Sequence, residues 1–380
     1  MSSERRFAAE RARPLVDRVA RDLPVGWRLL DWDSDQGLSL IVEGRGRELL
    51  IELSLRDDSV PCFARTERLN VTARDPFAEG RRLDSPELEV IASVTAALAA
   101  AEGALGELPR QATAGTRCLV RSVAAERALV REGRGQYYLN PYVGCTIGCS
   151  FCFVERQADL PRALDGLPRR PWGGWVDVKQ DLPEVLAREV LRLPPGVVRM
   201  SPIVTDPYQP LERRHRVTRR CLEVLLPRGF SPCVLTRAAR VVEDVPLLAR
   251  FERALVGLSI PTDDDRVRHA FEPGADPIGA RLQALRACRR AGLGTFAVIQ
   301  PMLPLDPERL VARLAPWVDV VRVDRLHLPE RVQSIYAERG WLHALDPAWF
   351  EDTRQRLLEG FARHGVGHHP LDDLSSLMGK

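Results

Sequence analysis

The feature that most constrains this fold is a regular alternation of strand-like and helix-like stretches between about residues 136 and 330. Strand patterns, apolar and rich in β-branched residues, cover residues 137–142, 197–204, 231–236, 255–260, 295–300 and 318–323. Helical patterns lie between them, at residues 183–193, 211–226, 245–251, 279–291 and 307–314. Such alternation predicts parallel strands joined by helical crossovers. We therefore expect an α/β fold with a partial (β/α)6 TIM-like barrel, whose chemistry collects at the C-terminal strand ends.

The two ends of the chain follow other patterns. A helical stretch at 14–22, alternating strands and a second helix predict a small α+β domain over residues 1–115; the strands cover residues 27–33, 37–42 and 48–55. Ser85 is the expected N-cap of the second helix, with Pro86 in its first turn. After a linker near residues 103–115 come the barrel, residues 116–330, and a helical extension, residues 331–380.

Charge and hydropathy exclude several classes of protein. The net charge is +3 and the basic residues are spread along the chain, whereas a dedicated nucleic-acid-binding protein concentrates them on one face. The first ten residues have no apolar signal core, and no run of 18 apolar residues predicts a membrane span. We therefore expect a cytoplasmic protein without a membrane partner, and nucleic acid has little support as a partner.

Three of the eight cysteines form a compact motif. Cys145, Cys149 and Cys152 have the spacing C-x3-C-x2-C just after the first predicted barrel strand. Three thiolates on one loop can bind three irons of a 4Fe–4S cluster and leave the fourth iron open to another ligand. Gly144 and Gly148 permit the tight backbone that this requires.

Two other interpretations of these cysteines stay open. They could form a zinc knuckle with a distant fourth ligand, although zinc sites usually pair two C-x2-C units and this stretch has one. They could also be unligated core residues, as the five isolated cysteines are expected to be.

The cysteine motif resembles the signature of the radical S-adenosylmethionine (SAM) superfamily, with Phe151 as its aromatic residue and a predicted cofactor contact. The resemblance implies that the open iron chelates SAM. One-electron reduction then cleaves SAM to a 5′-deoxyadenosyl radical, which abstracts hydrogen from a substrate. The implied partners are SAM and an electron donor such as flavodoxin or ferredoxin.

Further motifs resemble the spore photoproduct lyase-like subfamily, over roughly residues 136–345. They are Met200–Glu212, Leu235–Arg237, Gly257–Ile260 and Phe271–Gly274. One departure concerns position 203: the lyase has a hydrogen-donor cysteine there, and this chain has Ile203. An alkyl side chain cannot donate a weakly bound hydrogen, which argues against direct reversal of thymine photoproducts. Residues 1–115 match no family that we can identify.

The resemblance also suggests SAM contacts at the strand ends. Thr205 and Asp206 would contact the methionyl or ribose groups, or else form an ordinary turn cap. Arg237 would clamp the SAM carboxylate, or else be a solvated loop residue. Ser259 would bind the carboxylate or ribose, or else be a buried serine bonded to the backbone. Gln300 ends the fifth strand, where similar enzymes seat adenine.

The leading hypothesis is therefore a radical SAM enzyme acting on an unknown substrate, such as a peptide or another macromolecule, which the N-terminal domain would help to recognise. One alternative is a lyase that repairs DNA photoproducts. The other is a non-enzymatic binding protein stabilised by zinc.

Overall fold

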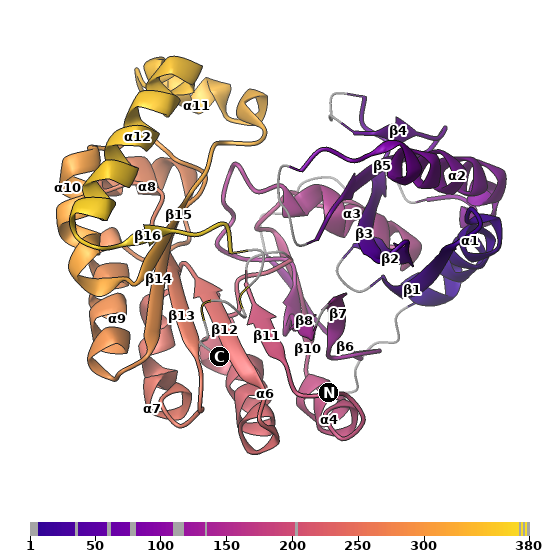
Figure 1. Ribbon diagram of the computed structural model, residues 1–380, viewed down its shortest axis with the longest axis horizontal. Helices are drawn as coiled ribbons and strands as arrows, with labels where there is room; N and C mark the ends of the chain where they lie inside the picture. The colour runs from indigo at the N-terminus through magenta and orange to yellow at the C-terminus, as the bar shows by residue number, and fades with distance from the viewer. Residues whose placement is uncertain are drawn as a thin grey trace.

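The computed structural model describes residues 7–34, 37–58, 62–76, 81–108, 118–133, 135–201, 204–371, 374 and 377. Two parts lie side by side (Figure 1). One is a curved parallel sheet with helices outside it, and the other is a smaller antiparallel sheet covered by two helices.

The larger part is built on an eight-stranded sheet in the order β16-β15-β14-β13-β12-β11-β8-β7. Its strands are β7 (Val130–Gly133), β8 (Gln136–Tyr138), β11 (Val197–Met200), β12 (Ser231–Thr236), β13 (Leu255–Ser259), β14 (Gly294–Ile299), β15 (Val320–Val323) and β16 (Gly367–His368). From β8 to β16 all neighbours run parallel, whereas β7 pairs antiparallel with β8. The six predicted barrel strands correspond to β8 and β11 to β15, so the predicted α/β fold is confirmed.

The first predicted strand is interrupted. Its end, β9 (Tyr142–Val143), leaves the large sheet and pairs with β10 (Trp175–Lys179), which also pairs with β6 (Leu119–Val123). This small sheet supports the start of the cysteine loop.

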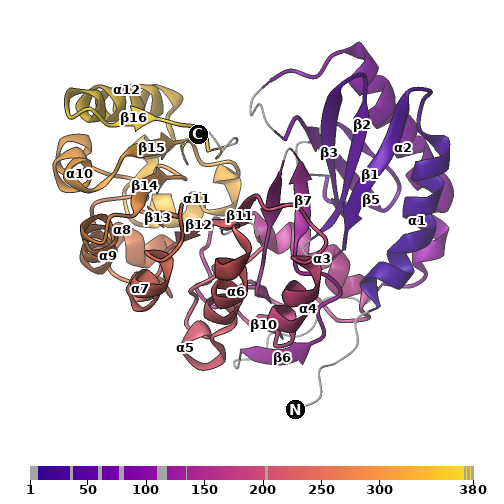
Figure 2. The same cartoon turned by 60° about the horizontal axis from the view of Figure 1, so that its bottom comes forward.

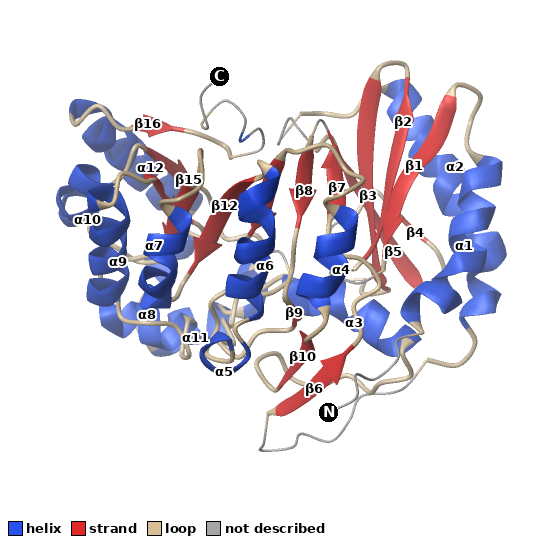
Figure 3. Cartoon of the chain, turned by 90° about the horizontal axis from the view of Figure 1, so that it is seen from below, coloured by secondary structure: helices blue, strands red, loops and turns tan. Residues whose placement is uncertain are grey.

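Helices cover the outer face of the parallel sheet, and Figure 3 shows several of them side by side. The helices of this part are α3 (Val154–Leu164), α4 (Leu182–Glu189), α5 (Glu212–His215), α6 (Val217–Leu225), α7 (Val245–Leu248), α8 (Asp265–Phe271), α9 (Ile278–Arg290) and α10 (Pro307–Leu314). Their apolar faces pack on outward side chains of the strands, as Leu222 and Leu285 do in the core with Val234 and Val256. The core therefore lies between sheet and helices, and the C-terminal strand ends remain available for a site.

The N-terminal part is the predicted α+β unit. Its sheet has the order β1-β2-β3-β5-β4, and α1 and α2 lie on the side away from the barrel (Figures 1 and 2). Its elements are α1 (Ala8–Asp22), β1 (Trp27–Asp33), β2 (Leu38–Gly44), β3 (Arg47–Leu55), β4 (Ala64–Arg65), β5 (Leu69–Arg74) and α2 (Ser85–Ala101). The predicted N-cap of α2 was wrong by one residue. Asp84 is the cap, because its carboxylate accepts from the Glu87 N–H while the Glu87 side chain accepts from the Asp84 N–H.

The N-terminal unit shares its core with the barrel. Leu160 and Leu164 of α3 lie in the same apolar cluster as residues of α1, α2 and the N-terminal sheet. Asp165, just after α3, accepts hydrogen bonds from the backbone of Phe7 and Ala8. The predicted boundary near residue 115 falls on the stretch 109–117, outside the described residues, and the division into three domains stays a prediction.

The C-terminal extension contains the predicted helices, α11 (Gln333–Glu338) and α12 (Pro347–Arg363). It then adds β16 to the edge strand β15. Beyond β16, Leu371 and Leu374 join an apolar cluster with Val197, Leu255 and Phe296 of the sheet. The end of the chain therefore packs on one face of the parallel strands.

One described helical stretch, Ser85–Leu105, is long and apolar enough to cross a membrane, with a mean hydropathy of 1.6 over its most apolar window. It corresponds to α2 and the short turn after it, and Val90, Val94 and Leu98 pack in the N-terminal core. Length and composition of this kind are also found in the core helices of soluble proteins.

Candidate active site

The cysteine loop joins β9 to α3 and depends on two glycines. Gly144 has φ +86° and Gly148 has φ +64°, a region that side chains with a Cβ rarely adopt. A Cβ on Gly144 would also lie 2.6 Å from the Trp175 carbonyl oxygen. The loop therefore needs glycine at Gly144 for both conformation and space, as the sequence indicated.

The three cysteine thiols lie together in buried surroundings. Burial, followed by the nearby Asp206 carboxylate, raises the pKa of Cys145 to about 12, and burial raises the pKa of Cys152 to about 11. The backbone N–H groups of Ile147 and Asp206 act in the opposite direction and lower the pKa of Cys145. The thiolate forms of these cysteines therefore need a positive charge to stabilise them, and the metal ions of a cluster would supply it.

The donor set fits an iron–sulfur cluster better than a single zinc ion. Within the described ranges, no three His, Cys, Asp or Glu side chains converge closely enough to hold one metal ion. In a cubane cluster each cysteine would bind a different iron, so such a cluster does not need three sulfurs that converge on one metal ion.

A buried glutamine holds the loop in place. Gln209 is fully buried, and its side-chain oxygen accepts from the Thr146 N–H at 2.9 Å. Its amide nitrogen donates to the Gly144 carbonyl at 3.1 Å and to the Thr205 hydroxyl oxygen at 2.7 Å. The sequence analysis quoted the motif around Gln209 but gave this residue no role.

Thr205 and Asp206 make the contacts of loop-positioning residues. The Thr205 hydroxyl donates to the Gly144 carbonyl at 2.7 Å. The Asp206 carboxylate accepts from the backbone N–H groups of Tyr208 and Arg237 and from the Thr236 hydroxyl. These bonds match the turn-cap interpretation, and a contact of either residue with SAM stays a prediction.

Arg237 belongs to a buried network of charges. Its Nε donates to Glu272 at 2.6 Å, and its guanidinium carbon lies 5.7 Å from the centre of the Phe151 ring. Glu272 is fully buried and also accepts from Arg281 at 2.6 Å. Burial by itself would raise the pKa of Glu272, but Arg281 and Arg237 hold it below its ordinary value. The alternative interpretation of Arg237 as a solvated loop residue is therefore wrong, because its side chain is only 11% exposed.

The Arg237 guanidinium faces the cysteine loop. It acts electrostatically on Cys149 and Cys152, lowering the pKa that burial raises at each thiol. Its two terminal nitrogens make no hydrogen bond to another described residue, since Glu272 takes only Nε. They are the donors that could meet a carboxylate, and that role for Arg237 stays a prediction.

Ser259 and Gln300 differ in how their side chains are used. Ser259 is 1% exposed, and its hydroxyl has no hydrogen-bond partner in the described part of the chain. Such an orphaned polar atom is costly unless a ligand pairs with it. The side-chain amide nitrogen of Gln300 instead donates to the Asp324 carboxylate at 3.2 Å and lies 2.9 Å from the His327 Nε2. Gln300 therefore contacts the loop that follows β15.

The Phe271–Gly274 segment, quoted from sequence without a role, buttresses the cysteine loop. The Ser150 N–H donates to the Phe271 carbonyl at 2.9 Å, and the Gly274 N–H donates to the Ile147 carbonyl at 3.0 Å. A Cβ on Gly274 would lie 2.8 Å from the Ile147 Cα, so only glycine permits this approach.

Comparison with known proteins agrees with this geometry. The sequence profile of the radical SAM superfamily matches residues 139–314, which include the cysteine loop and β11 to β14. Those residues form a radical SAM domain. The comparisons therefore indicate an enzyme that contains a radical SAM domain and whose reaction class stays open.

Several relatives give the extent of the similarity. The chain is 27% identical over 195 residues to an uncharacterised protein of Methanocaldococcus jannaschii, covering 51% of this chain and 71% of that protein. It is 25% identical over 165 residues to a radical SAM Nalpha-GlyT isomerase of Pseudomonas phage M6, covering 43% of this chain and 32% of the isomerase. A spore photoproduct lyase mutant is similar in structure, with 16% identity, a TM-score of 0.47, and coverage of 66% of this chain and 81% of the lyase. The lyase-like departure at Ile203 lies outside the described residues.

Proposed function

We propose that this radical SAM enzyme holds a 4Fe–4S cluster through Cys145, Cys149 and Cys152 and uses it to cleave SAM reductively. When bound, the cluster would supply one electron to SAM and so generate a 5′-deoxyadenosyl radical that abstracts hydrogen from a substrate. The substrate would be an organic molecule such as a peptide or another macromolecule. An electron donor such as flavodoxin or ferredoxin would reduce the cluster.

One observation carries the proposal: a single glycine-dependent loop holds three cysteines, of which Cys145 and Cys149 are buried and Cys152 is partly buried. Three protein ligands leave one iron of a cubane cluster open, and an open iron is the position at which SAM can be chelated.

The residues around the loop would orient the bound groups. Backbone N–H groups of Ile147 and Asp206 would stabilise the Cys145 thiolate, and Gln209 would hold the loop closed. The terminal nitrogens of Arg237 and the hydroxyl of Ser259 are donors without a hydrogen-bond partner among the described residues, and they would bind SAM. A guanidinium held by Glu272 is pre-oriented, so it loses little freedom when it binds a carboxylate.

The test is the iron content of alanine variants after anaerobic reconstitution. The parent should bind about four irons per chain, and Cys145→Ala, Cys149→Ala and Cys152→Ala should each lose the brown cluster and the cleavage of SAM by dithionite. Cys118→Ala is the matched control, because Cys118 is exposed and lies outside the loop. Full iron content in all three loop variants, or its loss in the control, would overturn the proposal.

A further inference from the structure

The N-terminal sheet has a second face, which α1 and α2 do not cover. Because side chains alternate along a strand, Leu40, Ile51 and Ala73 point into the core with the two helices. Their neighbours Ile41, Glu52 and Arg74 therefore point the other way, toward the barrel.

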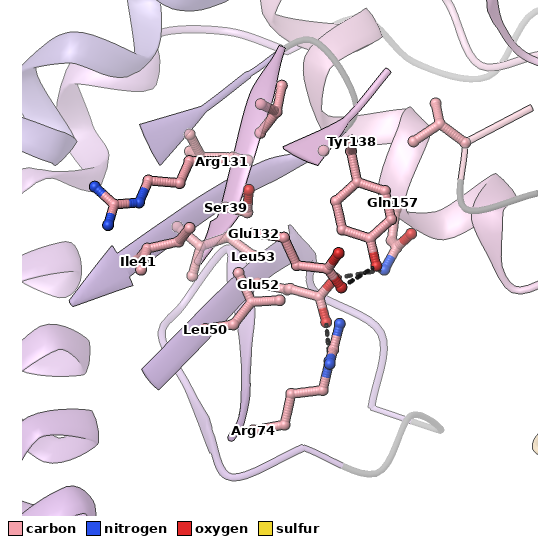
Figure 4. A pocket seen from close by; sticks show the side chains of 14 residues that line it. Ser39, Ile41, Leu50, Glu52, Leu53, Arg74, Arg131, Glu132, Tyr138 and Gln157 are labelled. Atoms are coloured by element: carbon pink, nitrogen blue, oxygen red, sulfur yellow. Dashed lines mark hydrogen bonds and ion pairs between the residues drawn. The ribbon is translucent and has the colours of Figure 1, made fainter. Parts of the chain in front are cut away.

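A cavity lies between this second face and the barrel (Figure 4). Its volume is about 60 Å³, and it opens to solvent. The barrel contributes Val130 and Glu132 of β7, Tyr138 of β8 and Gln157 of α3. The cavity therefore exists only because the N-terminal unit is docked on the barrel.

The charged side chains of the cavity differ in the hydrogen bonds that they make. Glu132 accepts from the Tyr138 hydroxyl at 2.7 Å and pairs with Arg199 at 3.2 Å. Glu52 accepts from the Gln157 amide at 3.0 Å. The Arg74 side chain makes no hydrogen bond to another described residue, and the nearest oxygen of its ion-pair partner Glu52 is 3.9 Å from its Nε.

The Arg74 guanidinium remains charged in this position. Burial would lower the pKa of Arg74, but the Glu52 carboxylate, with Tyr138 and Glu132 nearby, raises it above its ordinary value. A partly buried cation whose terminal nitrogens have no hydrogen-bond partner among the described residues is a ready partner for an anion. The apolar side chains of Ile41, Leu50, Val130 and Val204 line the same cavity.

We propose that this cavity is a recognition site for a substrate that carries a single carboxylate on an apolar body, with Arg74 as the anchor. A carboxylate suits the site better than a phosphate dianion, because the Glu52 and Glu132 carboxylates would repel a second negative charge. This proposal rests on the proposed function in one respect only, which is that the bound carboxylate is called a substrate of the enzyme.

The cavity also adjoins the candidate active site. Val204, in its wall, accepts a hydrogen bond from the Gly144 N–H at 3.3 Å, and Gly144 directly precedes Cys145. Gln157 lies on the helix that follows Cys152. A ligand in the cavity would therefore contact the elements that hold the cysteine loop.

The test uses the full chain without added SAM and three fluorinated probes, observed by ¹⁹F NMR titration. The probes are 4-fluorophenylacetate, 4-fluorophenyl phosphate and 4-fluorophenethylamine, which share a ring and differ in charge. The parent should bind the carboxylate more tightly than the phosphate and should not bind the amine. Arg74→Gln should weaken carboxylate binding about tenfold or more.

Two further variants separate binding from folding. Glu52→Gln should tighten carboxylate binding, since it removes the charge nearest Arg74, whereas a merely structural effect would weaken it. Arg28→Gln removes an equal charge from an exposed position on the same sheet and should change nothing. Absence of carboxylate binding to the parent, tighter binding of the phosphate, or equal affinities in Arg74→Gln and the parent would overturn the proposal. Because these measurements need no cluster, they can fail while the iron assay succeeds.

Discussion

Removal of the Glu272 carboxylate tests whether the buried charge network holds the active-site end of the barrel together. Glu272 is fully buried and lies 2.6 Å from both the Arg237 Nε and an Arg281 terminal nitrogen. Glu272→Ala would leave the fully buried Arg281 without its carboxylate partner. Breaking a buried pair in this way costs about 3–5 kcal/mol of unfolding free energy.

This cost converts to a change in melting temperature. At about 2.1 cal/mol/K of unfolding entropy per residue, 380 residues predict a decrease of about 4–6 °C. Differential scanning calorimetry of the cluster-free chain measures it directly. Glu308→Gln is the matched control, since the Glu308–Arg356 pair is exposed and should change the melting temperature within experimental error. If the two variants melt at the same temperature, the network is not stabilising in the way argued here.

Three further predictions follow from single observations. Ser259→Ala should leave the melting temperature unchanged or raise it, because the hydroxyl has no protein partner, and should weaken SAM binding about tenfold by calorimetry; unchanged SAM affinity would contradict the ligand role. Burial raises the pKa of Glu212 to about 7, above its unfolded value near 4.5, so folding favours the protonated form and stability should fall as pH rises from about 5 to 7; Glu212→Gln should flatten this slope in thermal melts at successive pH values, and equal slopes would refute the shift. A chain beginning at residue 116 should aggregate when examined by size-exclusion chromatography, since it exposes Leu160 and Leu164; a monodisperse, cluster-binding truncation would show the two units to be independent.

Several parts of the fold could be predicted because their signals are local in sequence. β12 and α10 have the predicted bounds, since a short apolar run around Val234 marks the strand and an amphipathic stretch opened by Pro307 marks the helix. The short strand β5 was missed, because its alternation in Leu69–Arg74 is too brief to separate from a loop. The N-cap of α2 was placed one residue late because Asp84 and Ser85 both favour that position and only geometry chooses between them.

The cysteine loop was predictable for the same reason, since its three sulfurs and two glycines lie within nine residues. The contacts that hold the loop were not, because they join distant segments. Gln209 reaches Gly144 across 65 residues, and Arg237 reaches Glu272 across 35. No periodicity or spacing in the sequence reports such pairs.

The sequence by itself determined the α/β class, the presence of parallel strands and the cysteine loop, because each depends on residues that are neighbours in the chain or on the period of one element. Only the tertiary structure decided which polar groups are paired and which are left for ligands. Ser259 and Arg237 both stand at the end of a predicted strand, so the sequence does not distinguish them. In the structure the Ser259 hydroxyl has no hydrogen-bond partner among the described residues, whereas Arg237 donates to Glu272 through Nε. The cavity beside Arg74 likewise forms only when two separately patterned units dock, because its wall is made from both.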